Sequence, residues 1–225
     1  MSKPALNRAT ITITFAQRSF NFDKMKKLLT AFLFFAAGSA YAGPIDLITN
    51  GSFEKNPIAA GSWTIKSGLD GWSVGSKGVE VRNNVAGTAQ DGGNFLELDS
   101  TGNSWISQTI DTIAGGEYNL SFFYAPRENT SAATNGIDVL WNGNLLKHVE
   151  QDNFTSKTNW FKIELSMFAV GSLSNLSFKA SGISDSIGGS LDNVSLTAAV
   201  PEPATIASLL LGLGMMGLTL RRRKQ

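Results

Sequence analysis

The chain has 225 residues and no cysteine, which excludes disulfide bonds, thiolate catalysis and thiolate metal sites. Its formal charge of +1 is unevenly distributed, because more than half of the basic residues lie outside residues 43–200. That region holds 9 Lys and Arg against 16 Asp and Glu, a net charge of −7. So acidic a region argues against nucleic acid or an anionic membrane surface as its partner.

The N-terminal residues have the pattern of a secretory signal peptide. Met25-Lys26-Lys27 is a basic start, Leu28–Ala37 is an apolar run of ten residues, and Ala40-Tyr41-Ala42 is a small-x-small cleavage pattern. The apolar run is too short to span a membrane alone. We expect a signal helix over residues 25–42, with cleavage after Ala42. Residues 1–24 are then an over-extended start, or alternatively a genuine long n-region.

Residues 45–197 show the pattern of strands and turns. Short runs rich in β-branched and aromatic residues alternate with clusters of Gly, Asn, Asp and Ser, and none keeps a 3.6-residue period long enough for a helix. Asn142-Gly143 favours a type I′ hairpin turn. The predicted strands are 45–49, 79–82, 95–99, 105–110, 118–124, 137–141, 145–149, 160–168, 176–180 and 191–197. This pattern predicts one all-β domain over residues 43–199, an antiparallel jelly-roll-type β-sandwich.

Alternation along the strands assigns their faces, since successive side chains of a strand point to opposite sides. Leu96 and Leu98 are predicted to face the core, which turns Glu97 and Asp99 toward solvent. The other predicted core residues are Ile106, Ile110, Leu120, Phe122, Val139, Trp141, Phe161, Ile163 and Leu165.

The C-terminus combines three features in 25 residues. Pro201-Glu202-Pro203 precedes 17 uncharged residues, 204–220, and then the basic cluster Arg221-Arg222-Arg223-Lys224. As a helix the apolar run would span ~25 Å, slightly less than a ~30 Å hydrocarbon core. We therefore expect a single transmembrane helix whose basic end stays in the cytoplasm.

This ending resembles the PEP-CTERM sorting signal of Gram-negative bacteria, over residues 200–225. The resemblance rests on the Pro201-Glu202-Pro203 triplet, the apolar run and the arginines Arg221, Arg222 and Arg223. It implies an exported protein held transiently in the cell membrane by its C-terminal helix and processed by exosortase, a membrane-embedded cysteine transpeptidase. The protein would then reside at the cell surface or in the extracellular matrix, where such proteins are associated with extracellular polysaccharide and biofilm.

The predicted sandwich has a second resemblance, to galactose-binding-like domains, which include many carbohydrate-binding modules. Thr49–Glu54, Gly71–Val74 and Gly189–Leu196 carry it. The resemblance implies a structural Ca²⁺ bound by Glu54 and Asp192, because Ca²⁺ prefers carboxylate and carbonyl oxygens. The alternative is that Glu54 caps a turn while Asp192 accepts hydrogen bonds from a neighbouring loop.

Trp105 and Trp160 are candidate glycan contacts, because alternation places both on the polar side of their strands and sugar rings stack on indoles. Tyr124 and Arg127 border a predicted loop and are candidate contacts there, and Arg82 is a weaker candidate. The alternative is that each aromatic ring is covered by a loop or belongs to the core.

An enzyme is the function that the sequence supports least. His148 is the only histidine, and no nucleophile elbow, paired metal-binding histidines or glycine-rich phosphate loop occurs. Glu97 and Asp99 are the pair of carboxylates that a glycoside hydrolase would need. We expect a non-enzymatic, glycan-binding protein, with a purely structural matrix or biofilm scaffold as the alternative.

Overall fold

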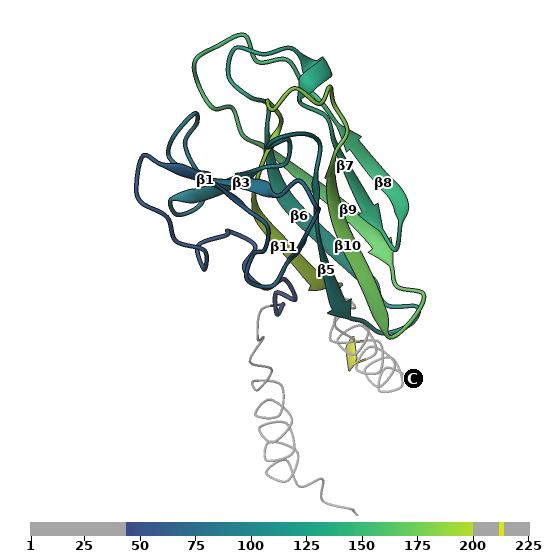
Figure 1. Ribbon diagram of the computed structural model, residues 1–225. Coiled ribbons are helices and arrows are strands. Elements are labelled where there is room, and N and C mark those ends of the chain that lie inside the picture. Colours follow the sequence, from purple (N-terminus) through teal and green to yellow (C-terminus); the bar gives the residue numbers. More distant parts are fainter. Residues whose placement is uncertain (1–43, 200–211, 214–225) are drawn as a thin grey trace, which may run out of the picture. The chain divides into compact units, whose positions relative to one another are not determined.

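The computed structural model describes residues 44–199 and residues 212–213 (Figure 1). The predicted signal peptide and nearly all of the predicted sorting signal lie outside the described residues. Within the described part of the chain, no helix has the length and apolar character needed to cross a membrane.

The domain consists of two antiparallel sheets, as predicted (Figure 1). The six-stranded sheet contains, in spatial order, β1 (Trp63–Lys66), β3 (Val79–Asn83), β4 (Asn94–Glu97), β11 (Ser190–Ala198), β6 (Glu117–Ala125) and β9 (Phe161–Phe168). The five-stranded sheet contains β2 (Ser73–Val74), β5 (Trp105–Asp111), β10 (Leu173–Ala180), β7 (Ile137–Trp141) and β8 (Asn144–Val149). A single 3₁₀ turn, η1 (Ala132–Thr134), lies between β6 and β7.

The hydrophobic core fills the space between the sheets, where the inward-facing side chains of the two sheets meet. Phe122 of β6 and Phe178 of β10 join the two sheets at its centre, with ring centroids 5.1 Å apart in edge-to-face contact. Most predicted core residues are buried there: Leu96, Leu98, Ile106, Ile110, Leu120, Phe122, Val139 and Trp141. Ile163 and Leu165 pack partly buried against the core, while Phe161 is 37% exposed at the sheet edge.

Nine of the ten predicted strands are confirmed to within a few residues. The prediction for residues 45–49 is wrong, because this segment makes only an isolated bridge, from Asp46 to Thr197. The edge strands β1 and β2 were not predicted, since runs of four and two residues give too little alternation to detect. The predicted turn is confirmed: Asn142 and Gly143 both have positive φ, 52° and 78°, as a type I′ turn requires.

The two ends of the sandwich differ in their connections (Figure 1). The loop end is formed by the long loops 126–136, 150–160 and 181–189. The tail end is formed by the short connections 112–116 and 169–172, and the described chain enters and leaves there. Two backbone hydrogen bonds place these parts together, Gly115 N to Ala169 O and Ala199 N to Glu117 O, both 2.8 Å long.

Candidate functional site

Charged side chains gather on the outer face of the six-stranded sheet, which is the face turned away from the core. Val79, Val81, Leu96 and Leu98 belong to the core, so the alternate residues of β3 and β4 point the other way. These outward residues are Glu80, Arg82, Phe95 and Glu97, and all four are buried by loops that cover the sheet.

Three of these residues, Glu80, Arg82 and Glu97, form one network with Arg127, and we call these four residues the charged cluster. Arg82 donates from Nε and Nη2 to Glu80 Oε2, over 2.9 and 2.7 Å, and its Nη2 also contacts Glu97 Oε2. Arg127, from the loop after β6, reaches the same Glu97 oxygen at 3.3 Å. The two arginines that the sequence offered as ligand contacts therefore meet at one carboxylate.

Glu97 and Asp99 were predicted to face solvent, and this prediction is wrong, since both are fully buried. The 181–189 loop folds back over them and supplies amide hydrogens. Gly188 N donates to Glu97 Oε1, while Asp185 N and Ser186 N donate to Asp99 Oδ2 over 2.9 and 3.1 Å. The alternation placed both carboxylates on the correct face, but it cannot show that a loop distant in sequence covers that face.

Burial dominates the electrostatics of this region. It raises the pKa of Glu80 and of Asp99, because a buried carboxylate loses its hydration, and it lowers the pKa of Arg127 for the same reason. Within the described part of the chain, Arg82 Nη1 and Asp99 Oδ1 are buried polar atoms without a hydrogen-bond partner. Such atoms mark positions where water or a polar group of a ligand completes the network.

Tyr124 does not offer a loop contact, contrary to the prediction. Its side chain is 1% exposed and belongs to the core. Its hydroxyl donates to Asn135 O over 3.1 Å and accepts from Gln151 N over 3.1 Å. Tyr124 thus anchors two loops of the loop end from within, and its burial raises the pKa of the phenol.

The two candidate tryptophans are positioned by strands of different sheets. Trp105 begins β5 of the five-stranded sheet and is 38% exposed. Trp160 precedes β9, packs edge-on against Phe95 with ring centroids 5.9 Å apart, and donates from Nε1 to Thr88 O over 2.9 Å. A third tryptophan, Trp63, was not predicted as a site residue; it is 54% exposed on β1, directly opposite Arg82.

Glu54 and Asp192 both hold the loop before β4. Glu54 Oε1 accepts hydrogen bonds from Gly93 N and Asn94 N, at 2.9 and 2.6 Å. Asp192 Oδ2 accepts from the backbone N–H groups of residues 90 and 91, at 2.8 and 3.0 Å. These bonds are the alternative role considered from the sequence. The described residues contain no cluster of three or more His, Asp or Glu side chains suited to a metal, so the calcium site stays a prediction.

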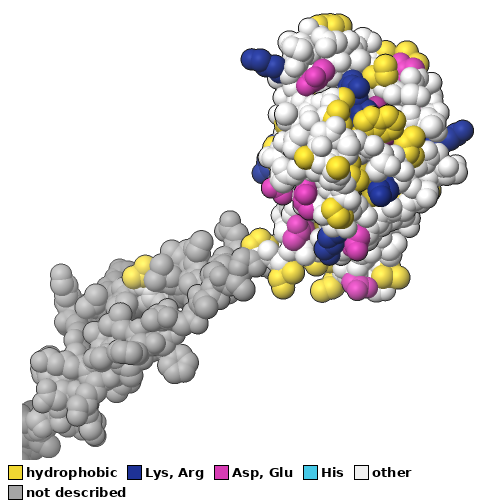
Figure 2. All heavy atoms as spheres, turned by 60° about the vertical axis from the view of Figure 1, so that its left-hand side comes forward, with side chains coloured by type: hydrophobic (Ala, Val, Ile, Leu, Met, Phe, Trp, Pro, Cys, Tyr) yellow, Lys and Arg dark blue, Asp and Glu magenta, His cyan; other side chains and the backbone are white. Residues whose placement is uncertain are grey.

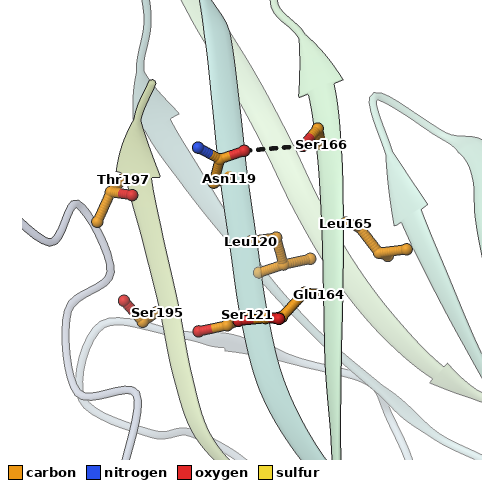
Figure 3. Close-up of a pocket in the computed structure, with 8 residues that line it drawn as sticks. All are labelled: Asn119, Leu120, Ser121, Glu164, Leu165, Ser166, Ser195 and Thr197. Atoms are coloured by element: carbon orange, nitrogen blue, oxygen red, sulfur yellow. Dashed lines mark hydrogen bonds between the residues drawn. The ribbon is translucent and has the colours of Figure 1, made fainter. Parts of the chain in front are cut away.

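A polar groove crosses the outer face of the same sheet nearer the tail end (Figure 3). Its volume is about 480 Å³. Two rows of side chains line it, Thr197, Asn119 and Ser166 in one and Ser195, Ser121 and Glu164 in the other, each row crossing β11, β6 and β9 in register. Leu120 and Leu165 complete the lining. Ser166 Oγ donates to Asn119 Oδ1 over 2.8 Å, drawn as the dashed line in Figure 3.

The groove was not predicted, although part of its signal is visible in the sequence. Asn119 and Ser121 alternate with core residues on β6, as Glu164 and Ser166 do on β9. What periodicity does not reveal is that β6 lies between β11 and β9, and only this order assembles the two rows.

His148 lies on the five-stranded sheet among polar neighbours. Its Nδ1 lies 2.7 Å from Asp138 Oδ1 and its Nε2 lies 3.3 Å from Glu150 Oε2, and the hydrogen bond to Asp138 raises its pKa. Ser181 Oγ lies 3.3 Å from the same Nδ1. Ser181 and Asp138 thus share one ring nitrogen, which differs from a Ser-His-Asp relay, where the serine and the aspartate contact opposite ring nitrogens.

Residues 46–197 match the family described as "Protein of unknown function (DUF642)". The chain is a member of the DUF642 family. Residues 199–224 match the PEP-CTERM protein-sorting motif, which confirms the prediction made from the C-terminal residues. The chain thus joins a DUF642 sandwich to a sorting motif of exported proteins.

Two curated relatives are multifunctional-autoprocessing repeats-in-toxin proteins. That of Vibrio cholerae is 30% identical over 161 residues, and that of Vibrio vulnificus is 31% identical over 154 residues. These matches cover 71% and 66% of this chain but only 3% of each relative. The relatives therefore share a sequence segment with this chain, and their whole-protein activities belong to far longer chains.

Among solved structures, the Stig cyclase FisC from Fischerella sp. TAU superposes with a TM-score of 0.53 and 18% identity, covering 71% of this chain and 100% of the cyclase. A family 35 carbohydrate-binding module from Clostridium thermocellum gives a TM-score of 0.43 and 15% identity, over 61% of this chain and 99% of the module. The likeness to the cyclase concerns the fold alone.

Proposed function

We propose that this DUF642 domain is a non-catalytic module that binds a polysaccharide outside the cell, and that the polar groove is its binding surface. The PEP-CTERM motif supports an extracellular setting. We further propose that exosortase processes the chain, after transient residence in the cell membrane, and leaves the domain at the cell surface or in the matrix.

The observation that carries the proposal is the chemistry of the groove. Its six polar side chains offer hydroxyl, amide and carboxylate groups, which match the donors and acceptors of sugar hydroxyls. The side chains of Asn119, Glu164 and Ser166 are exposed and ready to exchange water for a ligand. An open groove with dispersed polar contacts suits a chain of sugar units lying across three strands better than a small enclosed ligand.

The arrangement of Glu97 and Asp99 supports a non-catalytic role. Both are fully buried, and both have carboxylate oxygens engaged, Glu97 by two arginines and an amide and Asp99 by two amides. A glycoside hydrolase needs two carboxyl groups that reach the scissile bond from opposite sides. Covered and paired in this way, these two do not meet that requirement.

Binding of the full chain to exopolysaccharide purified from its native host, measured by titration calorimetry, tests the proposal. Replacing Asn119 and Ser166 together by Ala removes one cross-strand pair of the groove and should weaken binding at least tenfold. The matched control replaces Asn175 and Thr109, a similar cross-strand pair 3.4 Å apart on the five-stranded sheet, and should bind like the parent.

Two outcomes would contradict the proposal. Equal losses in the groove variant and in the control would remove the groove as the site. Absence of saturable binding, together with self-association of the parent, would favour the alternative of a structural matrix scaffold.

A further inference from the structure

The tail end of the domain exposes large apolar side chains. Ile45, Ile113, Val170 and Leu173 are 77%, 75%, 84% and 59% exposed, and we call them the apolar tips. Hydrophobic side chains are visible at the lower end of the coloured domain in Figure 2, interspersed with charged ones. Several large apolar groups gathered at one end of a domain are typical of a contact surface.

Hydrogen bonds hold two of the tips side by side. Gly115 N donates to Ala169 O and Ala169 N donates to Gly116 O, over 2.8 and 2.9 Å, and Thr112 N donates to Ser172 O over 2.9 Å. The loops that carry Ile113 and Val170 are therefore tied together as one unit. The side chains of Ile113 and Val170 are exposed on this unit.

The chain leaves the domain between the tips. Asp46 bridges Thr197, which places Ile45 beside the last residues of β11, and Ala199 is bonded to Glu117. The apolar run of the sorting motif begins at Ala204, five residues after Ala199. Five extended residues span at most ~18 Å. While that run is inserted in a bilayer, the short connection keeps the tail end within ~18 Å of the lipid.

The charges at this end indicate which lipid chemistry fits. The tail end carries the acidic residues Asp46, Asp111 and Glu117, and its described segments 44–47, 111–117, 168–175 and 195–199 contain no Lys or Arg. Attraction to anionic headgroups is therefore excluded as the driving force. The remaining driving force is burial of apolar side chains in the interfacial region of a bilayer, which does not need anionic lipid.

We propose that the folded domain rests on the membrane through the apolar tips while the sorting segment is inserted, with Ile113 and Val170 entering the lipid interface. The loop end, which carries the charged cluster, then points away from the membrane.

Site-specific fluorescence tests this contact directly, because the chain has no cysteine and a single introduced one is labelled uniquely. Val170→Cys and Phe154→Cys carry an environment-sensitive dye; both native side chains are strongly exposed, at 84% and 73%, on opposite ends of the domain. The full chain is placed in phosphatidylcholine nanodiscs with one copy per disc. We expect blue-shifted emission and quenching by nitroxide-labelled lipid at position 170, and neither at position 154.

A second label at Ile113→Cys repeats the measurement should Val170→Cys fail to fold. Labels at the tips that stay as water-accessible as the label at position 154 would overturn the proposal. Shielding of the tips that depends on protein concentration without lipid would also overturn it, because a second copy of the chain would then cover this end.

Discussion

Arg82 lies between two buried carboxylates. Without it, Glu97 would keep its contact with Arg127, but Glu80 would lose its ion-pair partner. Its side chain is 4% exposed and contacts Glu80 and Glu97, which are 9% and 0% exposed. Replacing Arg82 by Met should lower the free energy of unfolding by about 3–5 kcal/mol, because breaking a buried pair leaves an uncompensated charge. Urea unfolding measures this loss.

Arg127→Met is the matched control, since Arg127 contacts the same Glu97 but its side chain is 24% exposed. It should cost clearly less stability than Arg82→Met. Equal losses of stability in the two variants would contradict the expectation that Arg82 stabilises the charged cluster more than Arg127 does.

At position 143, backbone conformation alone accounts for the preference for glycine. Its φ is +78°, and an added Cβ would meet no atom within 4 Å. Gly143→Ala should therefore destabilise the domain by about 1 kcal/mol through the strained φ and not through a clash. Gly171→Ala is the control, since its Cβ would meet only one atom, at 3.8 Å, and its φ is not positive; its thermal midpoint should stay near that of the parent.

At the scale of elements, the loop before β4 shows how one segment is fixed by carboxylates from distant parts of the chain. Glu54, near the N-terminal end of the domain, and Asp192, on β11, each accept two amide hydrogens of residues 90–94. Replacing either carboxylate should loosen this loop, which also contacts Trp160 through Thr88. The loop thereby connects the first and last parts of the domain.

We propose that Ca²⁺ adds to these contacts, with Glu54 and Asp192 among its ligands. Thermal unfolding of the calcium-loaded chain, with and without excess EDTA, tests this proposal. Chelation should lower the midpoint, since an ion that binds only the folded state stabilises it by mass action. An unchanged midpoint in EDTA would leave the amide hydrogen bonds as the whole role of both carboxylates.

At the scale of the whole molecule, raised pKa values give stability a definite dependence on pH. Burial raises the pKa of Asp192 from 3.8 to about 7 and raises those of Glu80 and Asp99, while the hydrogen bond to Asp138 raises that of His148. Between about pH 4 and 7 the folded state therefore binds more protons than the unfolded state. Through Asp192, stability falls as pH rises through this window, by up to about 1.4 kcal/mol per pH unit, whereas the contribution of His148 is lost only above its ordinary pKa of 6.5.

Urea unfolding in calcium-free buffer from pH 4.5 to 8 should show this decline. Asp192→Asn keeps an oxygen for the amides of residues 90 and 91 but does not titrate, so it should flatten the slope between pH 5 and 7. Stability that increases with pH, or an unchanged slope in the variant, would contradict the raised pKa of Asp192.

What could be predicted from the sequence was local in origin. Nine strands, the Asn142-Gly143 turn and the inward faces of β4, β5 and β7 follow from periods and dihedral preferences that act over a few residues. The sorting motif is likewise a linear pattern. Glu97 and Asp99 were misplaced because their burial depends on loops tens of residues away in the chain, which no local pattern records. Tyr124 was misplaced although it alternates with the core residues Leu120 and Phe122, because it was assigned as a contact in the loop that follows its strand.

The sequence by itself therefore determined that this protein is a β-sandwich joined to a PEP-CTERM motif, because alternation and a contiguous motif are written along the chain. The tertiary structure decided everything that depends on strand order and loop cover. It joined Arg82 and Arg127 at Glu97, placed Trp105 on one sheet and Trp160 just before a strand of the other, and built the groove from β11, β6 and β9. It also brought the apolar tips to the end where the chain leaves the domain, since side chains far apart in sequence become neighbours only when the sheets are assembled.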